Sequence, residues 1–166
     1  MTAYAELTDT NDALVLSAGE GRRISVMGNE ILVKAGATDT AGAFSIWEAT
    51  VPPHFPGPYL HWHKGYEIFY LLEGRINFRL GEEERSVEAR PGAFVLVPPG
   101  VLHTFANPEE APARLLSITL PGGFEGYFEE LAEMLRNEAP WPPADMSQVL
   151  ALAAKYDSYP PPAPRR

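Results

Sequence analysis

Short apolar runs make up the chain from Ala13 to about Leu120, and each run is interrupted by glycine, proline or asparagine after a few residues. The 166 residues include 17 prolines and 14 glycines, both above average usage. Short runs between turn residues are typical of antiparallel strands in a sandwich or barrel, whereas a helical bundle needs long unbroken segments. We therefore expect one all-β domain, long enough to bury a core.

These runs are the predicted strands, and apolar and polar residues alternate in several of them, as expected for strands with one buried and one wet face. Gly28-Asn29 is predicted to form a two-residue hairpin turn, because both residues tolerate a positive φ. The predicted strands are Leu14–Leu16, Ile24–Met27, Ile31–Lys34, Phe44–Val51, Tyr59–His63, Ile68–Leu72, Arg75–Leu80, Arg85–Val87, Ala93–Val97, Leu102–Ala106 and Arg114–Leu120.

The periodicity changes after Gly122-Gly123, where apolar residues begin to recur at helical spacing. We expect an amphipathic helix that packs on the β core, followed by a second helix through Tyr156 with Asp145 and Gln148 as its capping box. The chain thus divides into a barrel with N-terminal strands (1–120), a helical segment (121–158) and a proline-rich tail (159–166). The apolar stripe of the first helix consists of Phe124, Tyr127, Phe128, Leu131 and Leu135.

Charge and cysteine content exclude several classes of function. The formal net charge of −9 repels nucleic-acid phosphates and anionic lipid surfaces, so we expect neither nucleic acid nor membrane as a partner. The residues Met1 to Asn11 are polar and do not resemble a secretory signal, which leads us to expect a cytoplasmic protein. Because there is no cysteine, a metal site must use histidine, aspartate or glutamate.

Three of the four histidines and one glutamate form a candidate metal-binding set. His61 and His63 are two residues apart in a predicted strand, so both imidazoles point to the same face. Glu67 has the same parity, and Gly65 between them allows the chain to bend so that the carboxylate joins the imidazoles. Two histidines and a carboxylate suit iron, manganese, nickel, cobalt, copper or zinc, and His103 offers a third imidazole from another strand.

Two longer patterns contain these residues. The first reads His61-x-His63, three residues, Glu67, six residues, Gly74. The second, which begins 17 residues after the first ends, consists of Gly92, Pro98-x-Gly100, His103 and Asn107.

Both patterns resemble the sequence motifs of the cupin family, over about residues 44–120. In one departure, the family's first motif begins with a glycine five residues before the first histidine, whereas Gly57 stands beside Pro56 and Pro58, nearer to His61. The 17-residue spacing is enough for one hairpin between the motifs. The C-terminal part resembles small single-domain bacterial cupins described as quercetin 2,3-dioxygenase-like.

The resemblance implies a jelly-roll-like double-stranded β-helix barrel that holds a divalent transition metal on His61, His63, Glu67 and His103. In a catalytic site such a metal keeps an open coordination position. The metal's identity among iron, nickel, manganese, cobalt, copper and zinc is left open, because sites of nitrogen and oxygen ligands depend on geometry and availability.

The neighbours of the ligands indicate an apolar substrate. By strand parity, Phe69 and Leu71 share the face of Glu67, and Phe105 shares the face of His103. Together with Tyr59, these side chains are predicted to line a pocket for an aromatic or apolar small molecule. The alternative is that they only fill the interior of the barrel.

We expect a metal-dependent dioxygenase that acts on an aromatic or enolisable molecule, in which Glu67 is both ligand and catalytic base. Two alternatives remain open: a redox-silent isomerase or lyase, and a non-catalytic binding or sensor protein. The N-terminal strands are expected to extend or swap onto a sheet edge, and a homodimer is predicted.

Overall fold

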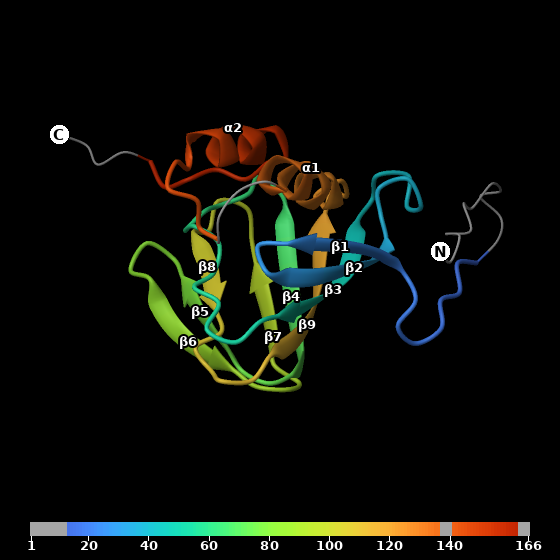
Figure 1. The fold of residues 1–166 in the computed structure, drawn as a ribbon, viewed down its shortest axis with the longest axis horizontal. Coiled ribbons are helices and arrows are strands. Elements are labelled where there is room, and N and C mark those ends of the chain that lie inside the picture. The colour runs from blue at the N-terminus through green and yellow to red at the C-terminus, as the bar shows by residue number, and fades with distance from the viewer. Residues whose placement is uncertain (1–12, 137–140, 163–166) are drawn as a thin grey trace.

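The computed structural model describes residues 13–136 and 141–162, which contain nine strands and two helices. Figure 1 shows strands folded into a barrel with the two helices over one end. The strands are β1 (Arg22–Val26), β2 (Asn29–Ala35), β3 (Ser45–Val51), β4 (Tyr66–Glu73), β5 (Ile76–Leu80), β6 (Arg85–Ala89), β7 (Phe94–Val97), β8 (His103–Ala106) and β9 (Ala113–Leu120), and the helices are α1 (Glu125–Leu135) and α2 (Ser147–Lys155).

The strands form two antiparallel sheets. The larger has six strands in the order β1-β2-β3-β9-β4-β7, and the smaller has three in the order β6-β5-β8. The β5–β6 hairpin supplies the connection expected between the two sequence motifs. The N-terminal strands β1 and β2 extend the larger sheet of their own chain beside β3. The predicted all-β fold with C-terminal helices is therefore confirmed.

Nine of the predicted strands occur within two residues of their expected bounds, but Leu14–Leu16 is not a strand. Val15 is 83% exposed, so no sheet covers this segment. The first hairpin turn is also placed one residue earlier than expected, since Met27 and Gly28 occupy it and both have positive φ. Asn29 instead begins β2 and is buried.

The predicted strand Tyr59–His63 is wrong as a continuous strand and forms two isolated bridges instead. His61 pairs with His103, whereas Trp62 pairs with Tyr159 near the C-terminus. Because consecutive residues bond to different segments, no ladder of hydrogen bonds develops. The side chains nevertheless alternate, which keeps the two histidines of this segment on one side.

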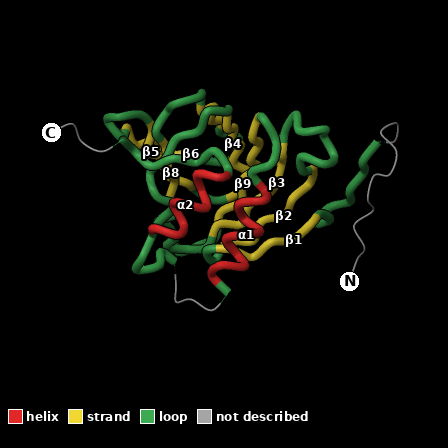
Figure 2. The backbone as a smooth tube through the Cα atoms, turned by 90° about the horizontal axis from the view of Figure 1, so that it is seen from above, coloured by secondary structure: helices red, strands yellow, loops and turns green. Residues whose placement is uncertain are grey.

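Helices α1 and α2 lie over one open end of the barrel, and Figure 2 looks down on them. Tyr127, Phe128 and Leu131 of α1 are buried, so the predicted apolar stripe packs on the core. The predicted capping box is wrong. Helix α2 begins at Ser147, and the Asp145 carboxylate accepts a hydrogen bond from the Ser147 backbone N–H at 2.9 Å.

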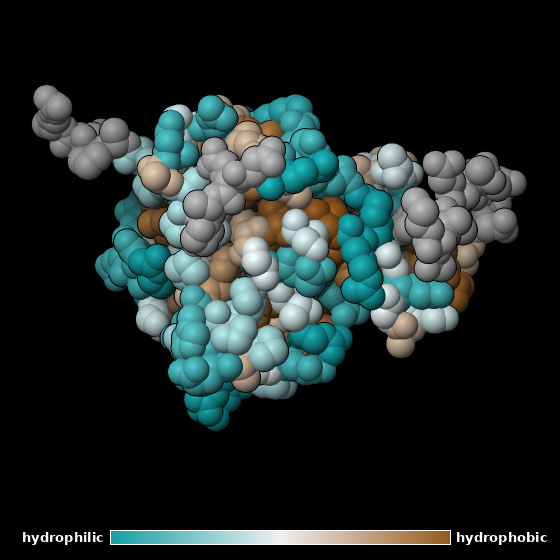
Figure 3. Space-filling model, viewed as in Figure 1, coloured by the Kyte–Doolittle hydropathy of each residue, from teal (hydrophilic) through white to brown (hydrophobic). Residues whose placement is uncertain are grey.

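Part of the predicted tail is ordered against the barrel, since Tyr159 forms its bridge with Trp62, while residues 163–166 lie outside the described residues. Within the described ranges, no helix combines the length and apolar character needed to cross a bilayer. Figure 3 shows a largely hydrophilic face with hydrophobic residues emerging below α1. A shallow pocket there lies between the β1–β2 turn and the end of α1.

Candidate metal centre

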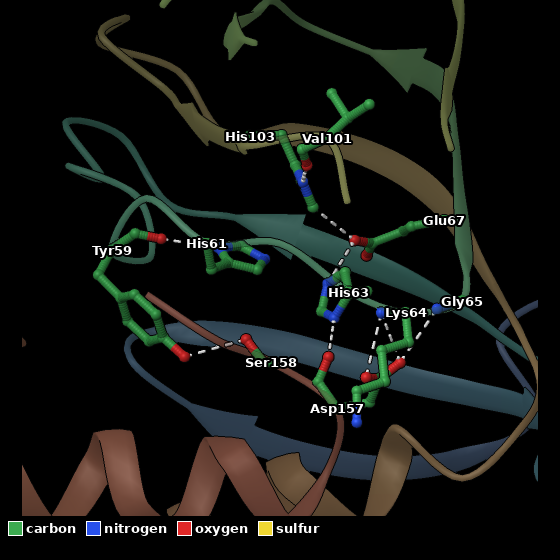
Figure 4. A network of polar contacts seen from close by, with 10 residues as sticks. All are labelled: Tyr59, His61, His63, Lys64, Gly65, Glu67, Val101, His103, Asp157 and Ser158. Atoms are coloured by element: carbon green, nitrogen blue, oxygen red, sulfur yellow. Dashed lines mark hydrogen bonds and ion pairs between the residues drawn. The ribbon is translucent and has the colours of Figure 1, made fainter. Parts of the chain in front are cut away.

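Four side chains converge inside the barrel from three parts of the chain (Figure 4). His61 and His63 belong to the connection before β4, Glu67 lies near the start of β4, and His103 begins β8. All four are buried, and one ligand atom from each lies within 4.8 Å of the others. The structure therefore brings together the complete set of predicted metal ligands.

Backbone contacts explain how residues so distant in sequence meet. The His61 N–H donates to the His103 carbonyl at 3.1 Å, and the His103 N–H donates to the His61 carbonyl at 2.8 Å. Gly65 permits the bend between His63 and Glu67, as expected, because a Cβ there would lie 2.4 Å from the Leu120 carbonyl oxygen. Only glycine fits this close approach to β9.

The departure from the family's first motif also has a structural role. Gly57 has a φ of +95°, and a Cβ on it would lie 1.9 Å from the Phe105 carbonyl oxygen. No L side chain can occupy this position without moving β8. Gly57 thus allows the segment before the first histidine to pack directly on the strand that carries His103.

Hydrogen bonds orient the three imidazoles. Nδ1 of His61 bonds to the Tyr59 carbonyl at 2.7 Å, and Nδ1 of His103 bonds to the Val101 carbonyl at 2.9 Å. Nδ1 of His63 bonds to the Asp157 carbonyl at 2.6 Å. A carbonyl oxygen only accepts, so each Nδ1 carries the proton and each Nε2 is left to act as a ligand.

The Glu67 carboxylate lies between two of these rings. Its Oε2 is 2.9 Å from His103 Nε2 and 3.2 Å from His63 Nε2. Burial opposes ionisation of Glu67, but the close contacts with the His103 and His63 rings outweigh it and hold the pKa of the carboxyl well below its usual 4.5. Glu67 is therefore an anion at neutral pH, the form in which it binds a cation.

Two histidines in the cluster have opposite pKa shifts. Burial lowers the pKa of His61 to about 3, helped by the neighbouring imidazoles. Burial also acts to lower the pKa of His63, but its ion-pair contact with the Glu67 carboxylate prevails and raises it above 6.5. His61 is thus neutral and ready to bind a metal over the physiological pH range.

The residues present fit a divalent transition metal. His63 Nε2 is buried without a hydrogen-bond partner among the described residues, and a metal would supply the missing interaction. Three imidazole nitrogens and one carboxylate oxygen, with no thiolate, suit the metals from manganese to zinc. His61, His63, Glu67 and His103 would hold it.

An apolar cavity of about 60 Å³ adjoins the cluster. Tyr59, Phe69 and Phe105 line it as predicted, next to His61 and Glu67. Leu71, in contrast, is buried but does not line this cavity, because it lies two residues farther along β4 and packs in the core. At ~10–15 Å³ per water molecule, the cavity has room for roughly four to six.

A second cavity, of about 290 Å³, adjoins the cluster at His63 and is lined by His63 and Thr119, among others. The Thr119 Oγ1 is buried and has no hydrogen-bond partner in the described part of the chain, and Thr119 pairs with Glu67 in the β4–β9 register. Phe124 lines both cavities and packs edge-on against His63, with ring centroids 5.3 Å apart. Phe124 thus borders both a small apolar chamber and a larger, more open one.

Sequence reasoning missed the C-terminal contributions to this site. The stripe of α1 was predicted to pack, but nothing indicated that Phe124, Tyr127 and Phe128 close the cavity. Ser158, which hydrogen-bonds the Tyr59 hydroxyl at 2.9 Å, also lines it. Asp157 had no sequence signal, since its bond to His63 uses a backbone carbonyl.

Comparisons with known proteins agree with this architecture. Residues 47–119 match a family model described as the cupin domain, and no curated protein matches the chain. The polyketide cyclase RemF from Streptomyces resistomycificus is similar, with a TM-score of 0.51 and 23% identity over 72% of this chain and 80% of that one.

Two further solved structures share the fold. An RmlC-like cupin from Shewanella frigidimarina has a TM-score of 0.56 and 14% identity, covering 67% of this chain and 93% of its own. A predicted oxalate decarboxylase from Thermotoga maritima has a TM-score of 0.56 and 20% identity, covering 66% and 99%. At these identities the likeness is one of fold, which is that of a cupin double-stranded β-helix.

Proposed function

Since the cupin domain match over residues 47–119 and the shared fold support membership of the cupin superfamily, we propose that this chain is a metal-dependent enzyme acting on a small, largely apolar, enolisable molecule. The observation that carries the proposal is the buried cluster of three histidines and one glutamate beside an apolar cavity. The preferred reaction is oxygenation by dioxygen, as in quercetin 2,3-dioxygenase-like cupins.

The residues of the cluster have two roles, as metal ligands and as the acceptor of a substrate proton. His61, His63 and His103 would hold the metal, with Glu67 as the fourth ligand. A divalent transition metal there would supply a Lewis acid to a substrate oxygen and, if redox-active, a path for electrons to dioxygen. Glu67 accepts the hydroxyl or enol proton of the substrate, because it is the one carboxylate among the described residues that line the apolar cavity.

The remaining contacts select the substrate. Phe69 and Phe105 pack against its apolar body, and no lysine or arginine lines the described part of the cavity to favour a phosphate. The free Thr119 hydroxyl is available to a ligand oxygen near Glu67. Because the apolar cavity measures only about 60 Å³, it suits a compact molecule or the edge of a larger one.

Oxygen uptake tests the proposal. Protein loaded separately with iron, nickel, manganese, cobalt or copper is mixed with a compact β-diketone such as acetylacetone, and with a flavonol as the larger substrate. We expect uptake with the compact substrate, with one dioxygen consumed per substrate molecule and no added reductant. Glu67→Gln should abolish turnover, whereas Glu73→Gln, an exposed change on the same strand, should not.

The reaction class follows from the same samples. Absence of oxygen uptake with every metal and substrate would overturn the oxygenase proposal. Product formed under strict anaerobiosis would instead indicate a redox-silent isomerase, lyase or cyclase, a second candidate favoured by the polyketide cyclase that shares this fold. A ligand that binds tightly and is recovered unchanged would indicate a binding protein.

A further inference from the structure

Residues 157–159 run alongside the segment that carries the first two histidines. The Trp62 N–H donates to the Tyr159 carbonyl at 2.9 Å, and the Tyr159 N–H donates to the Trp62 carbonyl at 3.0 Å. The Ser158 and Tyr59 hydroxyls hydrogen-bond at 2.9 Å. These contacts place residues 157–159, which lie outside the cupin domain match, against the segment that carries His61 and His63.

This arrangement distinguishes His63 from the other two histidines. His61 and His103 each bond through Nδ1 to a carbonyl two residues earlier in their own segment. His63 bonds through Nδ1 to the carbonyl of Asp157, 94 residues away, at 2.6 Å. The orientation of the His63 ring therefore depends on the C-terminal segment.

The Asp157 side chain holds the backbone that joins two ligands (Figure 4). Its two carboxylate oxygens accept hydrogen bonds from the Lys64 N–H at 3.1 and 3.0 Å, and one of them accepts from the Gly65 N–H at 3.1 Å. Lys64 and Gly65 lie between His63 and Glu67. Asp157 also has a φ of +61°, a conformation that aspartate, asparagine and glycine adopt more readily than other residues.

We propose that Asp157 is a positioning residue of the metal centre: its carbonyl orients the His63 ring, and its carboxylate fixes the backbone between His63 and Glu67. This inference rests on the proposed metal site and assigns part of its affinity to the C-terminal segment. Removing such a partner of a metal ligand typically costs ~10–100-fold in metal affinity. The loss should come with a changed ligand geometry, since without the carboxylate neither the backbone between His63 and Glu67 nor the carbonyl that orients the His63 ring is held in place.

The test compares metal binding by the full chain and three variants. Asp157→Gly removes the carboxylate while tolerating the positive φ, and Asp157→Asn restores an acceptor oxygen at that place. Asp145→Gly is the matched control, because the Asp145 carboxylate also accepts a backbone N–H in the C-terminal region but lies just before α2, and its acceptor bond is to Ser147. Dissociation constants for Co²⁺ and Zn²⁺ come from competition with a chromophoric chelator, and the visible spectrum of bound Co²⁺ reports its geometry.

We expect Asp157→Gly to weaken binding of both ions by ~10–100-fold and to shift the Co²⁺ spectrum. Asp157→Asn should recover most of the affinity, and Asp145→Gly should match the wild type. Wild-type affinity and spectrum in Asp157→Gly would overturn the inference, as would equal losses in both glycine variants. Failure of the wild type itself to bind either ion would instead refute the metal site, so the two failures are distinguishable.

Discussion

The two faces of the six-stranded sheet differ in chemistry although the same strands supply both. On β4, Glu67 and Phe69 point into the barrel and are buried, whereas Tyr66 and Tyr70 on the other face are 48% and 41% exposed. The inner face carries the buried cluster of three histidines and one glutamate. The outer face carries a group of apolar side chains that we call the outer apolar patch: Tyr66, Ile68, Tyr70, Phe94, Leu96, Leu116, Ile118 and Leu120.

Register explains why the outer apolar patch is continuous. Tyr70 is opposite Phe94 and Ile68 is opposite Leu96, so the apolar side chains of β4 and β7 lie side by side. Phe94 is 60% exposed. The patch contains no charged residue, although the chain as a whole carries −9. Exposed apolar patches of this kind mark interaction surfaces.

The difference teaches that alternation along a strand can separate two roles. The inner residues at one parity form the buried cluster, and we propose that the outer residues at the other parity contact a second copy of the chain. An acidic chain repels its own copy except through an uncharged surface, so the predicted homodimer is best placed on the outer apolar patch. Changes on one face should therefore leave the role of the other intact.

The largest expected effect is on the inner face. His103→Ala removes a ligand and leaves the Glu67 carboxylate without one of its two imidazole partners. We expect stoichiometric metal binding to be lost, a larger change than the ~10–100-fold expected for a residue that only orients a ligand. Elemental analysis of the purified protein measures it, and light scattering should show an unchanged mass. If the variant retained one metal per chain, His103 would not be a ligand of the metal.

A change on the outer face should have the second largest effect. The substitutions Phe94→Glu and Leu96→Glu together place two carboxylates per chain in the outer apolar patch. Like charges brought together across an interface cost several kcal/mol, so the dissociation constant of the dimer should rise by ~100-fold or more. Light scattering should show a dimer of two 18.2 kDa chains for the wild type and a monomer for the variant.

Metal content should stay the same in that variant, because both substituted side chains point away from the cluster. Glu82→Gln with Glu83→Gln, on the exposed β5–β6 turn, gives a control that alters charge elsewhere. A wild type that is monomeric at micromolar concentration would contradict the dimer, and a variant that stays dimeric would place the interface on another surface.

Strand parity grouped three of the ligands, and the resemblance to the two cupin motifs completed the predicted set with His103. Strand parity places His61, His63 and Glu67 on one side even though their segment is bridged rather than laddered. Parity likewise predicted Phe69 and Phe105 in the cavity, but it could not tell that Leu71 lies too far along β4. Parity defines a face and leaves the depth along the strand open.

The C-terminal contribution could not be predicted for a different physical reason. Asp157 acts on His63 through a backbone carbonyl, a group that every residue possesses. Its carboxylate accepts hydrogen bonds from backbone N–H groups, which have no sequence signature either. The closure of the barrel by α1 depends on how a helix predicted from its apolar stripe docks, and the stripe does not specify the partner.

The last expected effect is a pH dependence of the inner face. In the metal-free protein, burial lowers the pKa of His61 to about 3, whereas the interaction with Glu67 raises that of His63 above 6.5. An unfolded histidine titrates near 6.5. Between that pH and about 3, the unfolded chain binds more protons at His61, so this residue lowers stability by up to ~1.4 kcal/mol per pH unit as the pH falls. His63 acts in the opposite sense, because its contribution is complete below 6.5 and is lost as the pH rises through its own pKa.

Ring NMR of the metal-free protein separates the two histidines, with His61→Gln and His63→Gln for assignment. We expect His63 to be protonated at a pH where His61 remains neutral, because Glu67 contacts the His63 ring directly while His61 is surrounded by imidazoles. Protonation of His61 before His63 would contradict the proposed arrangement of charges. The outer apolar patch contains no histidine or carboxylate, so the mass of the dimer should stay constant over the same titration, and a dissociation that follows His63 would show that the two faces are coupled.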